Sequence, residues 1–181
     1  SKWREALGGS VKGIVTGSAP CPAKIIRVFS AAGIPVREAY GLTEASPGIS
    51  FNEFHPYKAI IGTVGPLLPE VEVRLDNSEG IYKEGDGEIL AAGENIMLGY
   101  YHQPQWTADV IKEIDGKIWL CTGDVGTFVI GNDGTKFLKI TDRKKELFKT
   151  SGGKYVAPAP IESKIKEDFM IDNVMLVGDG L

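Results

Sequence analysis

The spacing of apolar residues predicts a parallel unit in the first third of the chain. Residues 11–15 form an apolar run that ends in turn residues, as a buried strand does. Residues 21–33 place apolar side chains at helical spacing between Pro22 and Gly33, which predicts a helix. Residues 34–46 then begin as a strand and end as a loop. The order strand, helix, strand predicts a parallel crossover, whose ligands lie beyond the carboxyl ends of the strands.

From about residue 60, apolar residues recur at every second position. In residues 70–75 charged positions alternate with valine and leucine, which is typical of a strand with one face in water and one in the core. The same alternation is expected over 87–93, 117–130 and 135–140, with a hairpin turn at 131–134. The middle region is therefore predicted to be an antiparallel sheet or barrel.

The last segment predicts a helix over 157–168, which a proline starts, and a strand over 173–179. So few residues do not bury a core of their own, so we expect the chain to stop inside a domain. The predicted fold class is α/β to α+β: a partial parallel βαβ unit, an antiparallel β-barrel-like subdomain and the start of a small α+β domain. We place these three parts at residues 1–60, 61–141 and 142–181.

Composition excludes several classes of function. The chain has 181 residues, of which 43% are hydrophobic and 24% charged, as in folded globular proteins. A net charge of -4 provides no overall attraction to nucleic acid, so we expect no nucleic-acid partner. Cys21 and Cys121 match no disulfide framework or zinc spacing. No apolar run is long enough for a transmembrane segment, and no signal peptide is recognisable, so we expect a cytoplasmic protein. Peripheral membrane contact stays open.

The segment AYGLTEAS, residues 39–46, carries chemistry beyond the second predicted strand. Gly41 allows a ligand to approach the backbone, the hydroxyl of Thr43 can donate to a phosphate, and the carboxylate of Glu44 can hold Mg²⁺. Tyr40 can stack on a base. A purely structural alternative is that Thr43 caps a short helix with Glu44 in its first turn.

Two further strings contain candidate site residues. CTGDVG, residues 121–126, places Asp124 between glycines after an apolar run, where a carboxylate can accept both hydroxyls of a ribose. The alternative is an aspartate in an ordinary turn. The basic stretch at 139–158 surrounds a Gly-Gly pair, which predicts a hinge between two domains that handle a nucleotide. Arg143 can reach a phosphate or ribose there, although a solvated lysine run has the same composition.

Taken in order, the strings TGSAP, YGLTE, GTVGPLLP, TGDVG and DRKKELFKTSGGKYVAP resemble successive motifs of the adenylate-forming enzymes. This family includes acyl-CoA synthetases, nonribosomal peptide adenylation domains and firefly luciferase. The motifs cover nearly the whole chain, and the last one is most similar to that of long-chain fatty acid CoA ligases. The resemblance implies a two-step reaction. A fatty carboxylate attacks the α-phosphate of ATP to give an acyl-adenylate and pyrophosphate, and coenzyme A then displaces AMP.

The resemblance also implies roles for individual residues. Tyr40 would stack on adenine, with Gly41 beside it, Thr43 would contact phosphate, and Glu44 would bind Mg²⁺. Asp124 would hold the ribose hydroxyls. The remaining roles fall outside these two strings. Gly17, Ser18 and Ala19 would line the adenine and acyl pocket, and Arg143 would contact ribose or phosphate. Lys145 would be the hinge, and the loop at 151–155 would approach the pantetheine channel.

The chain departs from the family pattern in three places. The upstream phosphate loop with its lysine and the downstream catalytic lysine have no counterpart here, and Ser18 stands where the family usually has glycine. We therefore expect a piece of a longer ligase without ligase activity of its own, and acyl-adenylate formation by the isolated chain would contradict this. Two alternatives stay open. One is a ligase for another carboxylic acid or a carrier-protein acceptor, and the other is a non-catalytic β-rich nucleotide-binding module.

Overall fold

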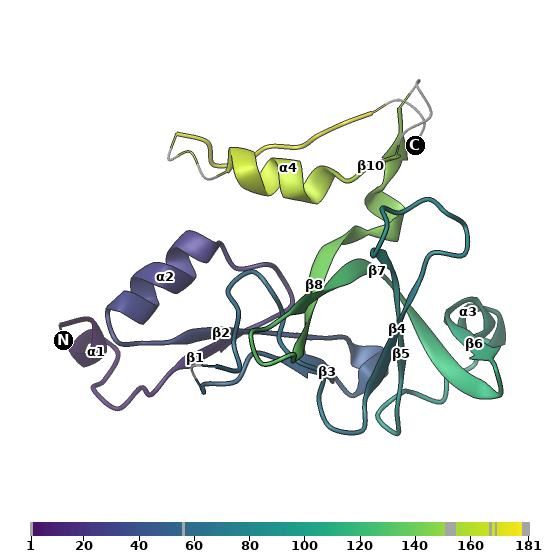
Figure 1. Cartoon of the computed structure of the whole chain (residues 1–181), viewed down its shortest axis with the longest axis horizontal. Helices are drawn as coiled ribbons and strands as arrows, with labels where there is room; N and C mark the ends of the chain where they lie inside the picture. The colour runs from purple at the N-terminus through teal and green to yellow at the C-terminus, as the bar shows by residue number, and fades with distance from the viewer. Residues whose placement is uncertain (1, 56, 151–154, 167, 169, 179–181) are drawn as a thin grey trace.

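The computed structural model describes residues 2–55, 57–150, 155–166, 168 and 170–178 (Figure 1). Its helices are α1 (Lys2–Ala6), α2 (Ala23–Ala31), η1 (Thr43–Ala45), α3 (Pro104–Val110), η2 (Lys144–Glu146) and α4 (Pro158–Ile165), where η marks a 3-10 helix. Its strands are β1 (Ile14–Thr16), β2 (Val36–Gly41), β3 (Gly48–Phe51), β4 (Glu72–Asp76), β5 (Gly87–Ala92), β6 (Ile111–Ile114), β7 (Lys117–Ile130), β8 (Lys136–Arg143), β9 (Phe148–Lys149) and β10 (Tyr155–Val156).

The predicted crossover unit is confirmed. β1 and β2 pair in parallel, and α2 connects them and packs against β2. The helix begins after Pro22 and buries Ile26, and Gly33 ends it with φ at 80°, a left-handed conformation that glycine adopts without strain. β3 adds an antiparallel partner to β2, which gives a three-stranded sheet in the order β1-β2-β3.

The middle of the chain forms a second, antiparallel sheet, as predicted, but it is not a barrel. Its strand order is β4-β5-β7-β6, and β8 also pairs with β7. The two parts of the long strand β7 pair with different strands. Its first part pairs with β6, and its second part pairs with β8 across the predicted hairpin. No pairing joins β4 to β6 or β8 within the described residues, so the sheet is open there and the barrel-like description is not confirmed.

The larger of two hydrophobic clusters lies between the two sheets, and the smaller one contains Leu90, Ala92 and Trp119. The buried members of the larger cluster come from both sheets: Tyr40, Ala45 and Ile49 from the first sheet and its turn, and Ile89, Ala91, Leu120 and Leu138 from the second. All six residues of β5 are buried. The prediction of one wet face therefore fails for this strand, because Ile89 and Ala91 pack into one cluster and the alternate residues Leu90 and Ala92 pack with Trp119 in the other.

The segment 64–68 joins the sheets through backbone hydrogen bonds. The N–H of Val64 donates to the carbonyl of Leu138 in β8 at 2.8 Å, and the N–H of Leu68 donates to Ile49 in β3 at 2.9 Å. Gly65 has φ at 97°, and a Cβ there would lie 2.1 Å from the backbone of Phe51. Only glycine fits this crossing, which explains the glycine in the GTVGPLLP string.

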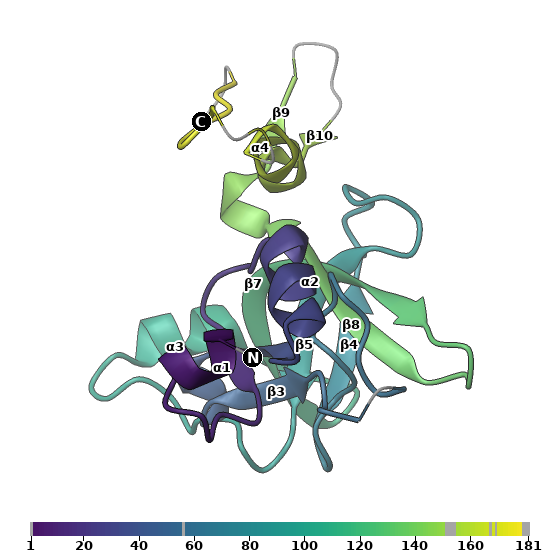
Figure 2. The ribbon, with the colours of Figure 1, turned by 90° about the vertical axis from the view of Figure 1, so that its left-hand side faces the viewer.

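The C-terminal segment lies apart from the sheets, with α4 above them in Figure 1 and above α2 in Figure 2. The predicted helix is confirmed as α4, which contacts β8. β9 and β10 pair antiparallel on either side of residues 151–154, and the predicted bend at 152–153 lies outside the described residues.

The strand predicted over 173–179 is not formed in its described part, residues 173–178. The N–H of Leu176 donates to the Glu162 side chain at 2.6 Å instead of to a neighbouring strand. Gly178 lies against the ring of Phe148. Alternate residues of the segment, Val174 and Leu176, are half-buried, whereas Met175 and Val177 are exposed. Among the described residues, no helix has the length and apolar character needed to cross a membrane.

Candidate nucleotide site

Asp124 lies inside a strand, which corrects its predicted place after one. β7 runs through the TGDVG string, and Asp124 is paired with Arg143 in β8. The register between β7 and β8 shifts between Val125 and Gly126, and Gly123 has φ at 74°. The glycines thus produce a local bulge, not a turn, and bulges of this kind re-aim the side chains beside them. The ordinary-turn alternative is excluded.

The carboxylate of Asp124 connects three strands. Its Oδ2 accepts a hydrogen bond of 2.7 Å from the hydroxyl of Tyr40 in β2, and its Oδ1 lies 3.4 Å from Nε of Arg143 at the end of β8. The Asp124 side chain is 16% exposed and that of Arg143 is 64% exposed. One face of the carboxylate is therefore fixed by the protein, and the other is open to solvent or a ligand.

Burial determines the ionisation of Tyr40. Desolvation raises its pKa, and the negative charge of Asp124 raises it further. Tyr40 therefore stays a neutral donor to a charged acceptor over the physiological range, which is a strong kind of hydrogen bond. Because only 8% of Tyr40 is exposed, most of the residue belongs to the core and little of it is open to a base.

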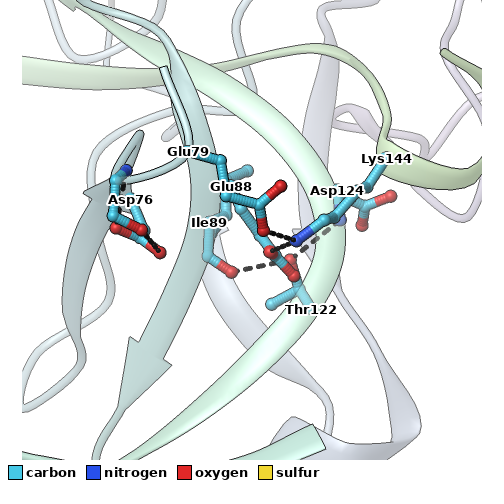
Figure 3. Close-up of polar contacts among 8 residues, drawn as sticks. Asp76, Glu79, Glu88, Ile89, Thr122, Asp124 and Lys144 are labelled. Atoms are coloured by element: carbon cyan, nitrogen blue, oxygen red, sulfur yellow. Dashed lines mark hydrogen bonds and ion pairs between the residues drawn. The ribbon is translucent and has the colours of Figure 1, made fainter. Parts of the chain in front are cut away.

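The backbone of Asp124 is also held. Its N–H donates to Oγ1 of Thr122 at 3.1 Å, and Thr122 donates to the carbonyl of Ile89 in β5 at 2.8 Å (Figure 3). This short relay fixes the bulge of β7 against the inner strand of the sheet. Asp124 is thus positioned from two directions, by its side chain and by its main chain.

Glu44 lies in the turn η1, directly after β2. Its Oε1 accepts a 2.6 Å hydrogen bond from the hydroxyl of Tyr100, and its carbonyl accepts one of 2.8 Å from the N–H of Met97. The capping alternative for Thr43 is excluded, because Leu42 occupies the N-cap position and no side chain caps the turn. Thr43 is exposed, and its carbonyl accepts from Ser46.

The TGSAP loop follows β1 at the carboxyl end of the parallel pair. Gly17, Ser18 and Ala19 are exposed. A Cβ on Gly17 would lie 3.2 Å from the carbonyl oxygen of Ala39, so this loop lies close to the backbone just before Tyr40. Ser18 has φ at 66°, the left-handed region that glycine adopts more readily. The serine therefore keeps the backbone shape that a glycine at this position would adopt freely.

The predicted site residues fall into three groups. Tyr40, Asp124 and Arg143 are in direct contact. Glu44 is held by Tyr100 instead, and Gly41 lies in β2, where a Cβ would lie 1.8 Å from the carbonyl oxygen of Pro47. Lys145 is exposed in η2. A cavity of about 490 Å³ lies over residues 98–111, includes Tyr100 in its wall and does not include Asp124.

Sequence reasoning missed the residues that support the site. Tyr100 and Glu44 are 56 positions apart, and no local pattern marks them as partners. Asn95 donates from Nδ2 to the carbonyls of Ala45 and Gly48, both at 2.8 Å, and so fixes the turn that carries Glu44. Asparagine after Gly-Glu looks like an ordinary loop residue, so its role was visible only in three dimensions.

Comparison with known proteins identifies the family of this chain. Residues 2–101, more than half of the chain, match the model of the AMP-binding enzyme family. The chain therefore belongs to the AMP-binding enzymes, and the resemblance inferred from its motifs is confirmed.

Two curated relatives and one solved structure illustrate what this chain is similar to. The long-chain-fatty-acid--CoA ligase FadD15 of Mycobacterium bovis is 38% identical over 98% of this chain and 27% of its own length. Long chain acyl-CoA synthetase 4 of Arabidopsis thaliana is 37% identical over 99% of this chain and 26% of its own. The crystal structure of ATP-bound MatB from Rhodopseudomonas palustris, 34% identical, superposes with a TM-score of 0.70 over 85% of this chain and 29% of that one. The chain thus spans about a quarter of the length of the curated relatives.

The hydrogen bond from Tyr100 to Glu44 should be detectable in the pKa of the Tyr100 hydroxyl. This bond, followed by desolvation, raises the Tyr100 pKa to about 12. We expect Glu44→Gln to return that pKa towards the ordinary value of about 10, because the charged acceptor is lost. Tyrosinate absorbance against pH, with Tyr100→Phe to identify the step, measures the shift.

The same pair makes stability depend on pH. Because the pKa of Tyr100 is raised in the folded state, its contribution is complete below about pH 10 and is lost as the pH rises through about 12. The wild-type chain should therefore lose more free energy of unfolding over that interval than Tyr100→Phe. An identical loss in both, or a step unmoved by Glu44→Gln, would show that the hydrogen bond does not form.

Proposed function

We propose that this chain is the nucleotide-binding and hinge-bearing part of an AMP-forming long-chain fatty acid CoA ligase. The ligase converts fatty acid, ATP and coenzyme A to acyl-CoA, AMP and pyrophosphate through an acyl-adenylate. The observation that carries the proposal is the Asp124 carboxylate, held by Tyr40 and paired with Arg143. The family match and the names of the similar ligases support the reaction class.

In this proposal Asp124 accepts the two ribose hydroxyls of ATP. A carboxylate has about four acceptor sites, and Tyr40 and Arg143 occupy only part of them. The exposed guanidinium of Arg143 has donors left over for a ribose or phosphate oxygen. Tyr40 stacks on the adenine with the small part of it that stays exposed. Since these groups are held before the ligand arrives, little ordering cost remains at the moment of binding.

In this proposal Thr43 contacts a phosphate of ATP, and Glu44 binds the Mg²⁺ that accompanies the phosphates. Within the described residues no group of three or more His, Cys, Asp or Glu side chains gathers into a metal site. This fits Mg²⁺ bound with ATP, which takes one or two protein carboxylates and completes its shell with phosphate oxygens and water. Glu44 is the carboxylate we assign to it, with Tyr100 keeping its Oε1 in place. When bound, the ion neutralises charge on the departing pyrophosphate.

The other predicted roles complete the proposal. Gly17, Ser18 and Ala19 line the adenine and acyl pocket beside Ala39. Residues 1–60 and 61–141 belong to the large domain and 142–181 begin the small one, which turns about Lys145 between the two half-reactions. Both cysteines are free, which suits a reducing compartment such as the cytoplasm.

Nucleotide binding tests the site directly. We expect Asp124→Asn to weaken binding of AMP to this chain by about tenfold or more, because a hydrogen bond to a charged group is lost at the ribose. Asp133→Asn is the matched control, since Asp133 lies in the exposed turn between β7 and β8. Titration calorimetry of both variants measures the effect. Equal affinities for the wild type and Asp124→Asn, or no AMP binding at all, would overturn the assignment.

Acids of graded length test the substrate class. The longest product of the reading frame that encodes this chain should release pyrophosphate fastest with long-chain fatty acids and pass the acyl group to coenzyme A. In that enzyme Glu44→Gln should lower magnesium-dependent pyrophosphate release by about a hundredfold, because charge stabilisation at the phosphates is lost. A preference for short or aromatic acids, or for a carrier protein as acceptor, would favour the other ligases, and an enzyme without adenylation would favour a binding module.

A further inference from the structure

Lys144, the residue before the proposed hinge, is tied to the second sheet. Its Nζ lies 2.8 Å from Oε2 of Glu88 in β5 and 3.4 Å from Oε1 of Glu79 in the loop between β4 and β5 (Figure 3). The Glu88 side chain is 10% exposed and that of Glu79 is 62% exposed. The two contacts therefore differ in kind: one is to a buried carboxylate, and the other is to a solvated one.

The buried contact matters more to the structure. A carboxylate that is out of water needs a partner, because an unpaired buried charge is strongly destabilising. Lys144 supplies that partner, and the hydrogen bond to Glu88 raises the pKa of Lys144, so it stays charged. An exposed pair such as Lys144 with Glu79 contributes little. Glu88 thus fixes the position of the Lys144 side chain, and Glu79 does not.

The strand that anchors Lys144 also anchors the nucleotide site. Glu88 is followed in β5 by Ile89, whose carbonyl accepts from Thr122, and Thr122 in turn accepts from the N–H of Asp124. The adjoining residue of the chain behaves differently. Lys145 is exposed, and no ion pair among the described residues includes it. The change from a fixed to a free side chain therefore falls between positions 144 and 145.

We propose that Lys144 is a positioning residue: through Glu88 it fixes the large-domain side of the hinge to β5, so that rotation of the small domain begins at Lys145. This inference rests on the proposed hinge role of Lys145. It goes beyond that role in stating that the rotation is confined to Lys145 and the residues after it, because Lys144 is attached to the same strand that holds Asp124. Without the attachment, the turn η2 would move with the small domain and the pivot would spread towards Arg143.

Hydrogen exchange of the chain itself tests the anchor and does not require ligase activity, so its failure is distinct from that of the proposed function. In Lys144→Met we expect the amides of residues 144–149 to exchange about tenfold faster, because a charge-assisted hydrogen bond that holds the turn is gone. Glu79→Gln is the matched control and should leave the rate unchanged. Faster exchange in Glu79→Gln equal to that in Lys144→Met would overturn the assignment to Glu88.

A double variant separates anchoring from general stability. Lys144→Met alone leaves a buried charge at Glu88, so we expect it also to speed exchange throughout β5 and β7. Lys144→Met with Glu88→Met removes both charges, so exchange in β5 and β7 should return to the wild-type rate while residues 144–149 stay about tenfold faster. If residues 144–149 also return to the wild-type rate in the double variant, the ion pair does not hold the hinge and the proposal is wrong.

Discussion

The hydrogen bond between Tyr40 and Asp124 is the contact on which the arrangement of this protein depends. It joins β2 of the first sheet to β7 of the second, and its two residues are 84 positions apart in the sequence. A hydrogen bond to a charged group contributes about 1.5–3 kcal/mol, whereas the contact with the exposed Arg143 contributes at most about 1 kcal/mol. The tyrosine therefore sets the position of the carboxylate, and the arginine stays available to a ligand.

The two sheets hold this contact in place because they share one core. Residues from η1 and β3 pack against residues of β5, β7 and β8, and segment 64–68 adds backbone hydrogen bonds between β3 and β8. β5 is the inner strand of this assembly. It buries every residue, supports Asp124 through Thr122 and pairs with Lys144 through Glu88. The proposed nucleotide site and the start of the proposed hinge thus have one common support.

Local pattern predicted what depends on local sequence. The crossover unit, the hairpin of β7 and β8 and the proline-started α4 all follow from spacing and turn residues. Sequence left open whether the second sheet closes, because closure depends on which edge strands pair, and alternation does not specify partners. The glycines around Asp124 looked like a turn because a bulge uses the same residues. Residues 173–178 have the apolar alternation of a strand but pair with no strand among the described residues.

The site was predicted only as far as its motifs reach. The ordered strings named Tyr40, Glu44, Asp124 and Arg143, whereas Tyr100 and Asn95 act across long separations that no motif records. The contacts of such supporting residues depend on the tertiary structure, so they can be identified only from the folded chain.

A double-mutant cycle between Tyr40→Phe and Asp124→Asn tests the central contact most directly, with the free energy of unfolding measured in urea. If the hydroxyl and the carboxylate hold each other as described, the two substitutions are coupled by about 1–3 kcal/mol. Additivity within about 0.5 kcal/mol would mean that the sheets are joined without this hydrogen bond, and that Asp124 is not positioned by Tyr40.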